Sequence, residues 1–481
     1  MAAKKKTDAP ATAVTMEKVA NLAKRRGFLF GGSDIYGGLQ GTYDYGHYGA
    51  LLKQRVKDAW LRANVQEMDN VVALDASILM HPKVWEASGH TANFADALVD
   101  DKISKKRYRA DHLIEEQLGM KVEGLSNEDL TKIFQENEIK TPEGQKADWT
   151  DVRSFNLMFK THAGPVDTSG PAGGDADAEA AAIYLRPETA QGIFVDYKEV
   201  QATTRKKLPF GIAQVGKAFR NEITPGKFIF RMREFEQMEI EFFCKPTESK
   251  QWHEWWQKER LRWYVDVLGI DPKKLKLRPH TKDELSHYSA GTSDIDYEFP
   301  FGFSELEGIA NRTDYDLAQH QKVSGKDLTY FDQSDGPKGK SYLPHVIEPS
   351  CGADRIVFAL LCDAYAEEPD EKGDVRTVLK LKPSIAPVSA AVLPLMNKPE
   401  LAKLSGKVRD DLAKDLMIDY DVTGSIGKRY RRQDEIGTPY CCTVDFESLE
   451  DKAVTVRERD SQKQERVKIA DLADYLSERL T

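Results

Sequence analysis

The sequence predicts two unlike parts: a large α+β domain organised around an antiparallel hairpin, then a small α/β domain. Residues 216–241 predict two antiparallel strands joined by a basic loop. From about Lys382 onward, strand-like runs alternate with helix-like runs, which is typical of an α/β domain with a mostly parallel sheet. The 481 residues are enough to bury a large core and form two or three domains.

The hairpin carries the side chains that suit ATP together with an amine. Its first strand is predicted from Gly216 to Glu222, and the return strand brings aromatic and basic residues ahead of an acidic run. A guanidinium such as Arg220 can grip a phosphate and offset charge that grows on its oxygens. Phe235 can stack on a purine, and Glu222 can accept the exocyclic amine of adenine. For any single residue, a solvated amphipathic hairpin is the alternative.

These residues form a recognisable motif. Phe219-Arg220-Asn221-Glu222, followed after a loop by Arg231 to Phe235, resembles motif 2 of the class II aminoacyl-tRNA synthetases. LRPETAQG at 185–192 and REFEQMEIEFF at 233–243 narrow the resemblance to glycyl-tRNA synthetases of the homodimeric type. The resemblance covers nearly the whole chain. It implies a catalytic domain with the class II synthetase fold, an α+β domain built on an antiparallel sheet, and a C-terminal α/β anticodon-binding domain.

The resemblance also implies boundaries and partners. It divides the chain into a flexible tail at 1–15, a catalytic domain at 16–380 with an insertion at about 115–180, and an anticodon-binding domain at 385–481. A predicted helix at 49–61 and strand at 71–77 resemble motif 1, which forms the dimer interface, so a homodimer is expected. The basic run at 428–432 could hold RNA phosphates, with Tyr430 available for stacking; a solvated face is the alternative.

A second motif-like stretch lies near residue 350. HVIEPSCGADRIVFALLCDAY at 345–365 predicts a strand, a tight Pro-Ser-Cys-Gly turn and an apolar helix. It resembles motif 3, whose arginine, here Arg355, contacts the γ-phosphate. Gly352 permits close approach of the backbone to the nucleotide. Without the resemblance, a surface charge on a helix would be the simpler reading of Arg355.

Residue by residue, the resemblance places the substrates. Arg220 and Arg355 are the catalytic candidates. The positions implied to bind ATP are Arg220, Asn221, Glu222, Phe230, Arg231, Arg233, Phe235, Glu305, Leu306, Gly352, Asp354 and Arg355. The positions implied to bind the amino acid are Arg109, Glu188, Phe235, Gln237, Glu239, Arg312, Glu348, Ser350 and Gly352. For Glu188, a carboxylate for an α-ammonium group competes with a local helix-capping role.

Magnesium is the one metal expected. ATP is used as its magnesium complex, and Glu305 is the candidate ligand, whereas Glu307 and Asp314 are interpreted as ordinary surface acids. Some relatives carry a cysteine pair near residues 101–104, where this chain has Asp101 and Ser104. The five cysteines include no C-x-x-C pair, so no structural zinc and no disulfide framework is expected.

Composition limits the remaining possibilities. Lysine plus arginine number 69 and aspartate plus glutamate 78, which gives a net charge of −9. The overall charge therefore does not indicate a nucleic-acid partner. No run of 18 apolar residues occurs, and the N-terminal segment lacks the apolar core of a signal peptide. A cytoplasmic protein that contacts neither membrane nor DNA is therefore expected.

The sequence thus predicts a ligase. It would activate glycine with ATP to glycyl-adenylate and transfer glycine to the 3′ end of glycine tRNA. Two alternatives stay open: a class II adenylating enzyme with another acceptor, or one that only makes dinucleotide polyphosphates, and a non-catalytic RNA-binding relative. The latter is expected to lose Arg220, Glu222 or Arg355, and all three are present.

Overall fold

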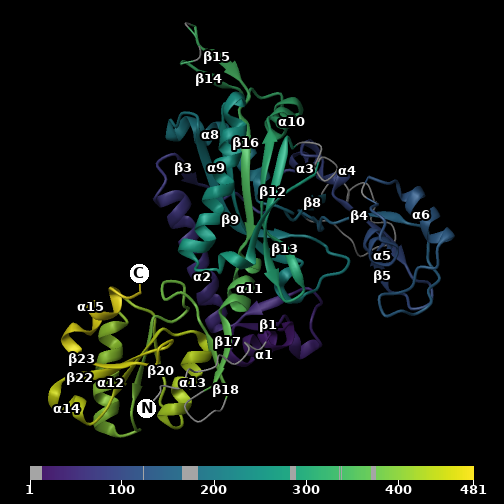
Figure 1. Ribbon diagram of the computed structural model, residues 1–481. Helices are drawn as coiled ribbons and strands as arrows, with labels where there is room; N and C mark the ends of the chain where they lie inside the picture. The colour runs from purple at the N-terminus through teal and green to yellow at the C-terminus, as the bar shows by residue number, and fades with distance from the viewer. Residues whose placement is uncertain are drawn as a thin grey trace, which may run out of the picture.

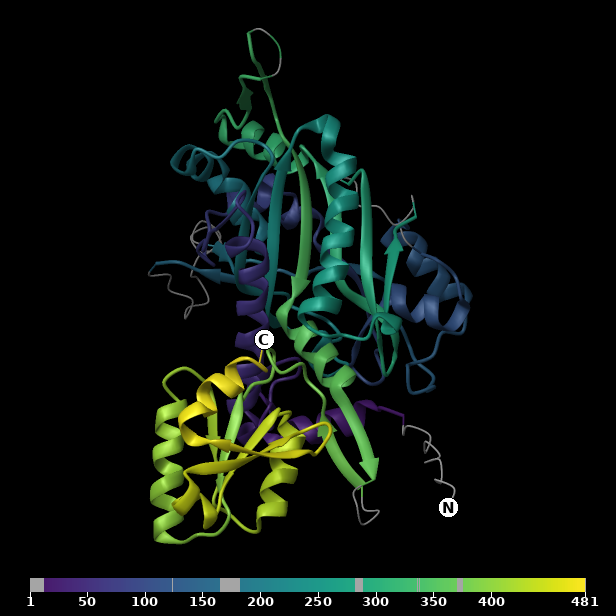
Figure 2. The same cartoon turned by 60° about the vertical axis from the view of Figure 1, so that its left-hand side comes forward.

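The computed structural model describes residues 13–122, 124–164, 182–281, 289–334, 336, 338–369 and 375–480 (Figure 1). The expected N-terminal tail and the low-complexity end of the insertion lie almost entirely outside these residues. One large sheet dominates the molecule. A smaller C-terminal sheet lies below it in Figures 1 and 2.

The large sheet is almost wholly antiparallel. Its order is β11-β12-β13-β16-β10-β9-β3, and only the β3–β9 pair at one edge is parallel. The α+β fold class predicted from the sequence is confirmed. The strands are β3 (Val71–Ala73), β9 (Phe210–Phe219), β10 (Glu234–Cys244), β11 (Leu275–Pro279), β12 (Gly291–Phe299), β13 (Gly302–Thr313) and β16 (His345–Gly352).

The expected hairpin is present, but its strands end elsewhere. β9 and β10 pair from Phe210 opposite Phe243 to Phe219 opposite Glu234. The first strand therefore stops at Phe219, short of the predicted Glu222. Phe228–Phe230, expected in the return strand, forms a 3-10 turn. Lys227 and Phe228 have φ values of 54° and 60°, which are incompatible with an extended strand.

The two faces of β10 are chemically different. Met238, Ile240 and Phe242 lie in the main apolar core, which α9 (Ser249–Arg262) and α11 (Ala353–Ala364) cover. Because side chains alternate along a strand, Glu239 and Glu241 point to the opposite face, which α8 (Ala190–Thr204) covers. The tryptophan-rich segment expected to pack as a helix does so: Trp256 of α9 and Trp263, just after it, are buried.

Motif 3 differs from expectation in its backbone. The residues from Pro349 to Gly352 form no tight turn, because β16 runs on to Gly352 and α11 begins immediately afterwards. Cys351 is paired with Met238 on one side and Glu307 on the other, which keeps the segment extended. Glu307 is also not a surface acid. It is 1% exposed and lies 2.7 Å from the Arg260 guanidinium.

A small sheet at residues 95–156 begins before the insertion predicted at about 115–180 and ends within it. β4 (Ala95–Asp100) pairs with β5 (Arg107–Arg109) and β6 (Arg153–Asn156), beside α5 (Ala110–Leu118) and α6 (Asn127–Glu136). The sequence FNLMFKTHAG at 155–164 predicts one continuous strand, and the structure contradicts this prediction. β6 ends at Asn156, whose side chain bonds to backbone atoms of His90, Thr91 and Met158. β7 (Lys160–His162) then pairs with β8 (Ala182–Tyr184).

The remaining elements before the C-terminal sheet are short, apart from α1, α2 and α10. They are α1 (Met16–Arg26), β1 (Leu29–Gly31), β2 (Tyr43–Tyr45), α2 (His47–Leu61), α3 (Lys83–Ala87), α4 (His90–Asn93), α10 (Tyr315–Ser324), β14 (Tyr330–Asp332), β15 (Lys340–Tyr342), β17 (Tyr365–Pro369) and β18 (Val375–Leu379).

The C-terminal sheet has the order β20-β19-β21-β22-β23 and is only half parallel. β20, β19 and β21 are parallel, whereas β22 and β23 are antiparallel because only residues 459–463 join them, too few for a crossover. The elements are β19 (Ala390–Pro394), α12 (Pro399–Leu412), β20 (Ile418–Tyr420), α13 (Ile426–Ile436), β21 (Tyr440–Val444), α14 (Glu447–Asp451), β22 (Ala453–Glu458), β23 (Gln464–Lys468) and α15 (Leu472–Ser477).

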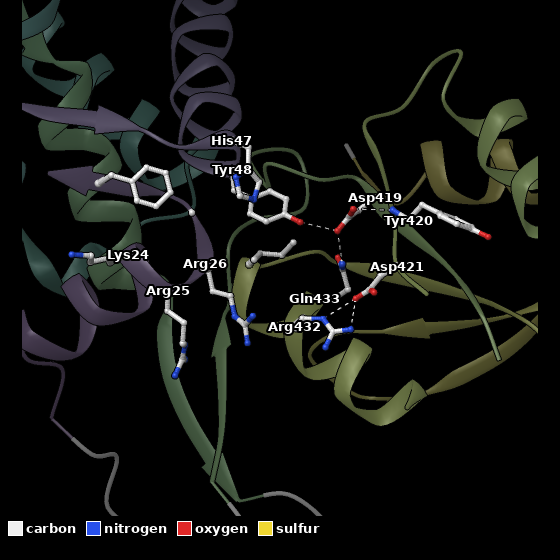
Figure 3. Close-up of a pocket in the computed structure, with 13 residues that line it drawn as sticks. Lys24, Arg25, Arg26, His47, Tyr48, Asp419, Tyr420, Asp421, Arg432 and Gln433 are labelled. Atoms are coloured by element: carbon white, nitrogen blue, oxygen red, sulfur yellow. Dashed lines mark hydrogen bonds and ion pairs between the residues drawn. The ribbon is translucent and has the colours of Figure 1, made fainter. Parts of the chain in front are cut away.

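A pocket of about 370 Å³ separates this domain from α1 and α2 (Figure 3). Across it, the Tyr48 hydroxyl donates to Asp419 at 2.8 Å, and Gln433 donates to the same carboxylate. Beside it, Arg25 pairs with Glu435 at 3.0 Å. These contacts tie the two parts of the molecule together.

The basic run at 428–432 is not the uniform RNA surface that was expected. Arg429 is 2% exposed and donates to the backbone carbonyls of Pro394 and Gly424. The Tyr430 hydroxyl bonds to Thr443. Lys428 and Arg431 are exposed. Arg429 therefore stabilises the domain and is not available to a phosphate, while the Tyr430 hydroxyl is engaged within the domain.

All five cysteines are buried free thiols, and burial raises the pKa of each. Among the described residues, none of the helices is long and apolar enough to cross a membrane. The same part of the chain holds no group of three or more His, Cys, Asp or Glu side chains that could bind a metal.

Candidate active site

A pocket of about 170 Å³ lies where the β9–β10 loop meets β13, β16 and α11. It gathers residues that are far apart in the sequence. Most of the predicted ATP-binding positions line it. The predicted residues in its wall are Arg220, Glu222, Phe230, Arg231, Phe235, Gln237, Glu305, Ser350, Gly352, Asp354 and Arg355.

The two arginines expected to be catalytic are braced by backbone carbonyls. Arg220 donates from Nε to the carbonyl of Pro187 at 3.0 Å, and its guanidinium lies 5.4 Å from the ring of Phe235. Arg355 donates from Nε to the carbonyl of Phe230 at 3.2 Å and stacks on the Phe230 ring at 4.4 Å. Among the described residues Arg220 forms no ion pair, so its charge is available to an anionic ligand.

Glu305 is the carboxylate at the rim of this pocket. Its Oε2 lies 3.3 Å from Arg355, whose charge is the main cause that lowers the pKa of Glu305. Asp294 lies nearby on the neighbouring strand, and burial and then the charge of Glu305 raise its pKa. Asp294 is 5% exposed and already pairs with Arg278 at 2.5 Å and with His280 at 2.8 Å, so Glu305 is the carboxylate of the two that faces the place predicted for the triphosphate.

Four of the predicted ATP-binding positions have other contacts. Arg233 donates to the carbonyls of Gln40 and Glu222 and so braces the loop. The Asn221 backbone N–H donates to the carbonyl of Leu157. The Leu306 side chain is 1% exposed within the apolar core, so only its backbone could reach a nucleotide. The carboxylate of Asp354 accepts from protein donors, as described below.

Arg109, at the end of β5, does not line the pocket, although the pocket-wall residue Glu222 is near enough to contribute to raising its pKa. Its guanidinium pairs with Asp96 at 3.0 Å and with Asp111 at 2.5 Å. It lines a different pocket, together with His112 and Glu115. The structure thus does not bring Arg109 together with the other residues expected to bind the amino acid.

Five carboxylates, four of them buried and the fifth, Glu188, with its side chain 13% exposed, lie directly behind the ATP pocket, and we call them the acidic cluster. Gln237 and Ser350 belong to the pocket wall and both donate to Glu239, at 3.1 and 2.7 Å. Arg312 bonds to two other members, Glu348 at 2.6 Å and Asp316 at 2.8 Å. The cluster comprises Glu188, Glu239, Glu241, Asp316 and Glu348.

The acidic cluster has more negative charge than its surroundings neutralise. Within the part of the chain that the structure describes, Arg312 is its one arginine partner, and His90, 3.3 Å from Glu188, is charged only when protonated. Both carboxylate oxygens of Glu241 are buried, and neither has a hydrogen-bond partner in the structure as described. Burial raises the pKa of Glu241 well above its usual value. A cation is the natural complement to such a cluster.

The members of the cluster respond differently to this crowding. Burial and the charge of Glu188 raise the pKa of Glu239. Burial, Glu239 and Glu188 raise the pKa of Glu348 to about 8 despite its ion pair with Arg312. Glu188 is the exception: burial alone would raise its pKa, but His90 and Arg312 more than reverse this and lower it.

Sequence reasoning missed one member of the acidic cluster, Asp316, and several residues that contact the cluster. The Thr189 backbone N–H donates to Glu239 at 3.0 Å, and the Gln191 side chain donates to Glu188 at 2.9 Å and Asp316 at 3.0 Å. Thr189 and Gln191 belong to LRPETAQG, so the motif could have indicated them. His90 and Asp316 carry no comparable signal in the sequence.

Comparisons with known proteins identify the family. The glycine–tRNA ligase of Macrococcus caseolyticus is 54% identical over 471 residues, which make up 97% of this chain and 98% of that protein. The chain belongs to the glycine–tRNA ligase family. The glycine–tRNA ligase of Geobacillus thermodenitrificans is likewise 54% identical, over 473 residues that cover 97% of this chain and 98% of that protein. The expected family resemblance is confirmed.

The fold and the C-terminal domain have matches of their own. Residues 389–479 match the family model described as "Anticodon binding domain". A prolyl-tRNA synthetase from Cryptosporidium parvum, solved with L-proline and AMP, has a TM-score of 0.60 and 14% sequence identity, covering 98% of this chain and 79% of that one. At this identity the match shows the fold alone: glycine–tRNA ligases of this kind share the class II synthetase fold.

Proposed function

We propose that this chain activates glycine with ATP and then transfers the glycyl group to the 3′ end of glycine tRNA. Membership of the glycine–tRNA ligase family supports the overall reaction. One observation supports the roles that we assign to individual residues: the pocket lined by Arg220 and Arg355 lies directly in front of the acidic cluster.

In the first step, the glycine ammonium group enters the acidic cluster and donates charge-assisted hydrogen bonds to Glu188, Glu239 and Ser350. Its carboxylate is left facing the ATP pocket. The carboxylate attacks the α-phosphate of ATP, an acyl–phosphate bond forms, and pyrophosphate leaves. No covalent protein nucleophile takes part.

ATP is held by the residues of the pocket. Phe235 stacks on the adenine and Glu222 accepts its amine. Arg220 stabilises the charge that grows on the α-phosphate oxygens, and Arg355 holds the γ-phosphate. Because substrate and ATP are both fixed, positioning supplies a large part of the rate.

Magnesium accompanies the ATP. One available donor fits it, since Mg²⁺ binds through one or two carboxylates together with substrate phosphates, and Glu305 lies in the wall of the pocket predicted for the triphosphate. When bound, the ion neutralises phosphate charge. Glu305 is its proposed protein ligand, and no structural zinc is required.

The second step needs tRNA. The anticodon-binding match over residues 389–479 supports an RNA partner for the C-terminal domain. The exposed Lys428 is a candidate for phosphate contact there.

The resemblance of 49–61 and 71–77 to motif 1 supports a homodimer, and β3 lies at an edge of the large sheet where a second copy can pack. We propose a cytoplasmic location, where tRNA charging takes place.

A non-catalytic RNA-binding protein is the second candidate function. Arg220, Glu222 and Arg355 lie in one pocket, which disfavours this candidate because such a protein has no need of them. An adenylating enzyme with another acceptor is disfavoured by the anticodon-binding match.

Glycine-dependent ATP–pyrophosphate exchange tests the proposal. Wild-type protein should exchange with glycine and not with alanine or serine, since a pocket shaped for glycine excludes a larger side chain sterically. Arg220→Ala should lower the exchange rate roughly 100- to 1000-fold, about 3 to 4 kcal/mol in the barrier. Exchange by Arg220→Ala at a near wild-type rate would refute the catalytic role of Arg220. The absence of exchange with any amino acid would refute the proposal that this protein is an enzyme.

A further inference from the structure

Asp354 joins four elements of the fold. It lies in the first turn of α11, is 2% exposed, and immediately precedes Arg355. Its Oδ1 accepts from the Tyr45 hydroxyl at 2.5 Å and from Lys53 Nζ at 3.0 Å. Its Oδ2 accepts from the backbone N–H of Glu236 at 2.8 Å. The donors come from β2, α2 and β10, so α11 is fixed to all three.

Lys53 links the same carboxylate to a second one. Its Nζ lies 2.5 Å from Glu236 Oε2, and it also lies 4.3 Å from the centre of the Tyr45 ring. Burial alone would lower the pKa of Lys53, but Asp354 and Glu236 more than reverse this, so the ammonium group stays charged. One mostly buried cation therefore bridges the starts of α11 and β10.

The residues next to this bridge line the ATP pocket. Arg355 follows Asp354, and Phe235 precedes Glu236. Phe235 lies against the guanidinium of Arg220, and Arg355 lies against the ring of Phe230. Lys53, Tyr45 and the carboxylate of Asp354 thus set the spacing between the proposed γ-phosphate ligand and the proposed adenine platform. A displacement of about 1 Å in such a site can cost roughly 100-fold in rate.

We infer that Lys53 and Tyr45 are positioning residues for ATP in the adenylation step: through Asp354 and Glu236 they hold Arg355 and Phe235 at the separation that ATP requires. Neither residue touches the substrates. The inference rests on the proposed function, because it assumes that ATP binds between Arg355 and Phe235.

The chain offers a matched control on the same helix. Lys57 lies one turn after Lys53, and its Nζ lies 3.1 Å from Glu236 Oε1. It shares the charge, the helix and the Glu236 contact, but among the described residues it has no contact with Asp354. Lys57→Met therefore removes a lysine of the same helix together with its Glu236 contact, but it leaves in place the Asp354 ion pair and the Tyr45 ring contact that Lys53→Met removes.

The experiment is pyrophosphate exchange by the full-length enzyme, with KM for ATP and KM for glycine measured separately. Lys53→Met should lower kcat/KM for ATP about 10- to 100-fold and leave KM for glycine within about twofold. Tyr45→Phe should show the same selective effect to a smaller extent, because Lys53 and the Glu236 N–H still hold Asp354. Lys57→Met should stay within about twofold of wild type for both substrates.

A double-mutant cycle with Arg355→Ala shows whether Lys53 acts through its neighbour. If it does, Lys53→Met loses most of its effect once Arg355 is absent. Equal effects in both backgrounds, an equal loss for ATP and glycine, or no difference from Lys57→Met overturns the inference. If the wild-type protein still exchanges pyrophosphate with glycine in these cases, only the inference is overturned and the proposed function is retained. If the wild-type protein shows no exchange with glycine, both the proposed function and the inference are overturned.

Discussion

Two buried ionic clusters differ in how their charges are balanced. Where the C-terminal domain meets β17 and β18, Asp434 bonds to Arg457 at 2.9 Å and to Arg376 of β18 at 2.9 Å, and Arg376 also pairs with Glu368 of β17. Two cations thus meet two carboxylates. In the acidic cluster, five carboxylates share Arg312 and a histidine.

The difference teaches what each cluster is for. None of the side-chain atoms of Asp434, Arg376 and Arg457 is a buried atom without a hydrogen-bond partner in the described structure. Both oxygens of Glu241 are such atoms, as is Oε1 of Gln237. A closed, neutral cluster serves stability, and removing one partner leaves a buried charge alone. An open cluster with surplus negative charge is incomplete until a cation binds.

Asp434→Ala should give the largest effect and break the closed cluster. Arg376 and Arg457 would stay buried without their carboxylate, so the free energy of unfolding should fall by about 3 to 5 kcal/mol. Denaturant titration measures this. KM for glycine, determined on the folded fraction, should not change. A loss below about 1 kcal/mol would mean that the closed cluster is not a stabilising feature.

Glu239→Gln should have the opposite signature in the open cluster. Losing one charge-assisted contact of about 1.5 to 3 kcal/mol should raise KM for glycine roughly 10- to 100-fold. Thermal stability should be unchanged or higher, because a surplus buried charge is removed. Glu298→Gln, an exposed glutamate of β12, is the control and should leave both quantities unchanged. If Glu239→Gln lowers stability and leaves KM for glycine unchanged, the acidic cluster serves stability, as the closed cluster does.

The pH dependence of glycine binding sharpens the comparison further. In the free protein, burial and like charges raise the pKa of Glu348 to about 8, so its carboxyl group is largely protonated at neutral pH. The glycine ammonium favours the ionised form, and binding therefore releases a proton. KM for glycine should fall as pH rises from 6 to 8, by up to about tenfold per pH unit for each proton released. A KM that is flat or rises over this range would contradict the assignment.

Glu241→Met should have the smallest effect. The carboxyl group has no partner among the described residues, so an apolar side chain of similar size should leave the free energy of unfolding unchanged or raise it by up to about 2 kcal/mol. Denaturant titration of this variant beside Asp434→Ala makes the direct comparison. A loss above about 2 kcal/mol would show that Glu241 has a stabilising partner.

The sequence predicted those parts of the site that lie close together along the chain. Arg220, Glu222 and Arg355 were found because each belongs to a short pattern. Glu307 was misread as a surface acid because its partner Arg260 lies on a helix that only the fold brings near. The strand ends were misplaced for a similar reason, since the positive φ values of Lys227 and Phe228 have no signal in their residue types.

Long-range pairs set the limit of sequence reasoning. Lys53 and Asp354 are 301 residues apart, and Gln191 and Asp316 are 125 apart. Nothing in the local pattern of either residue indicates its partner. The acidic run of β10 did predict that carboxylates gather near the substrate, but the surplus of charge became visible only when β10, β16, α8 and α10 were placed together.

The five buried thiols have a practical consequence. Alkylating reagents attack the thiolate, and burial disfavours that form in Cys244, Cys351, Cys362, Cys441 and Cys442. A cysteine introduced at an exposed position, such as Ser104 between β4 and β5 of the sheet that adjoins the insertion, or Ala473 in α15, would therefore react selectively in the unaltered wild-type background. A fluorescent dye at each of these two positions would report, by energy transfer, how far this sheet and the C-terminal domain move when ATP, glycine and tRNA are added in turn.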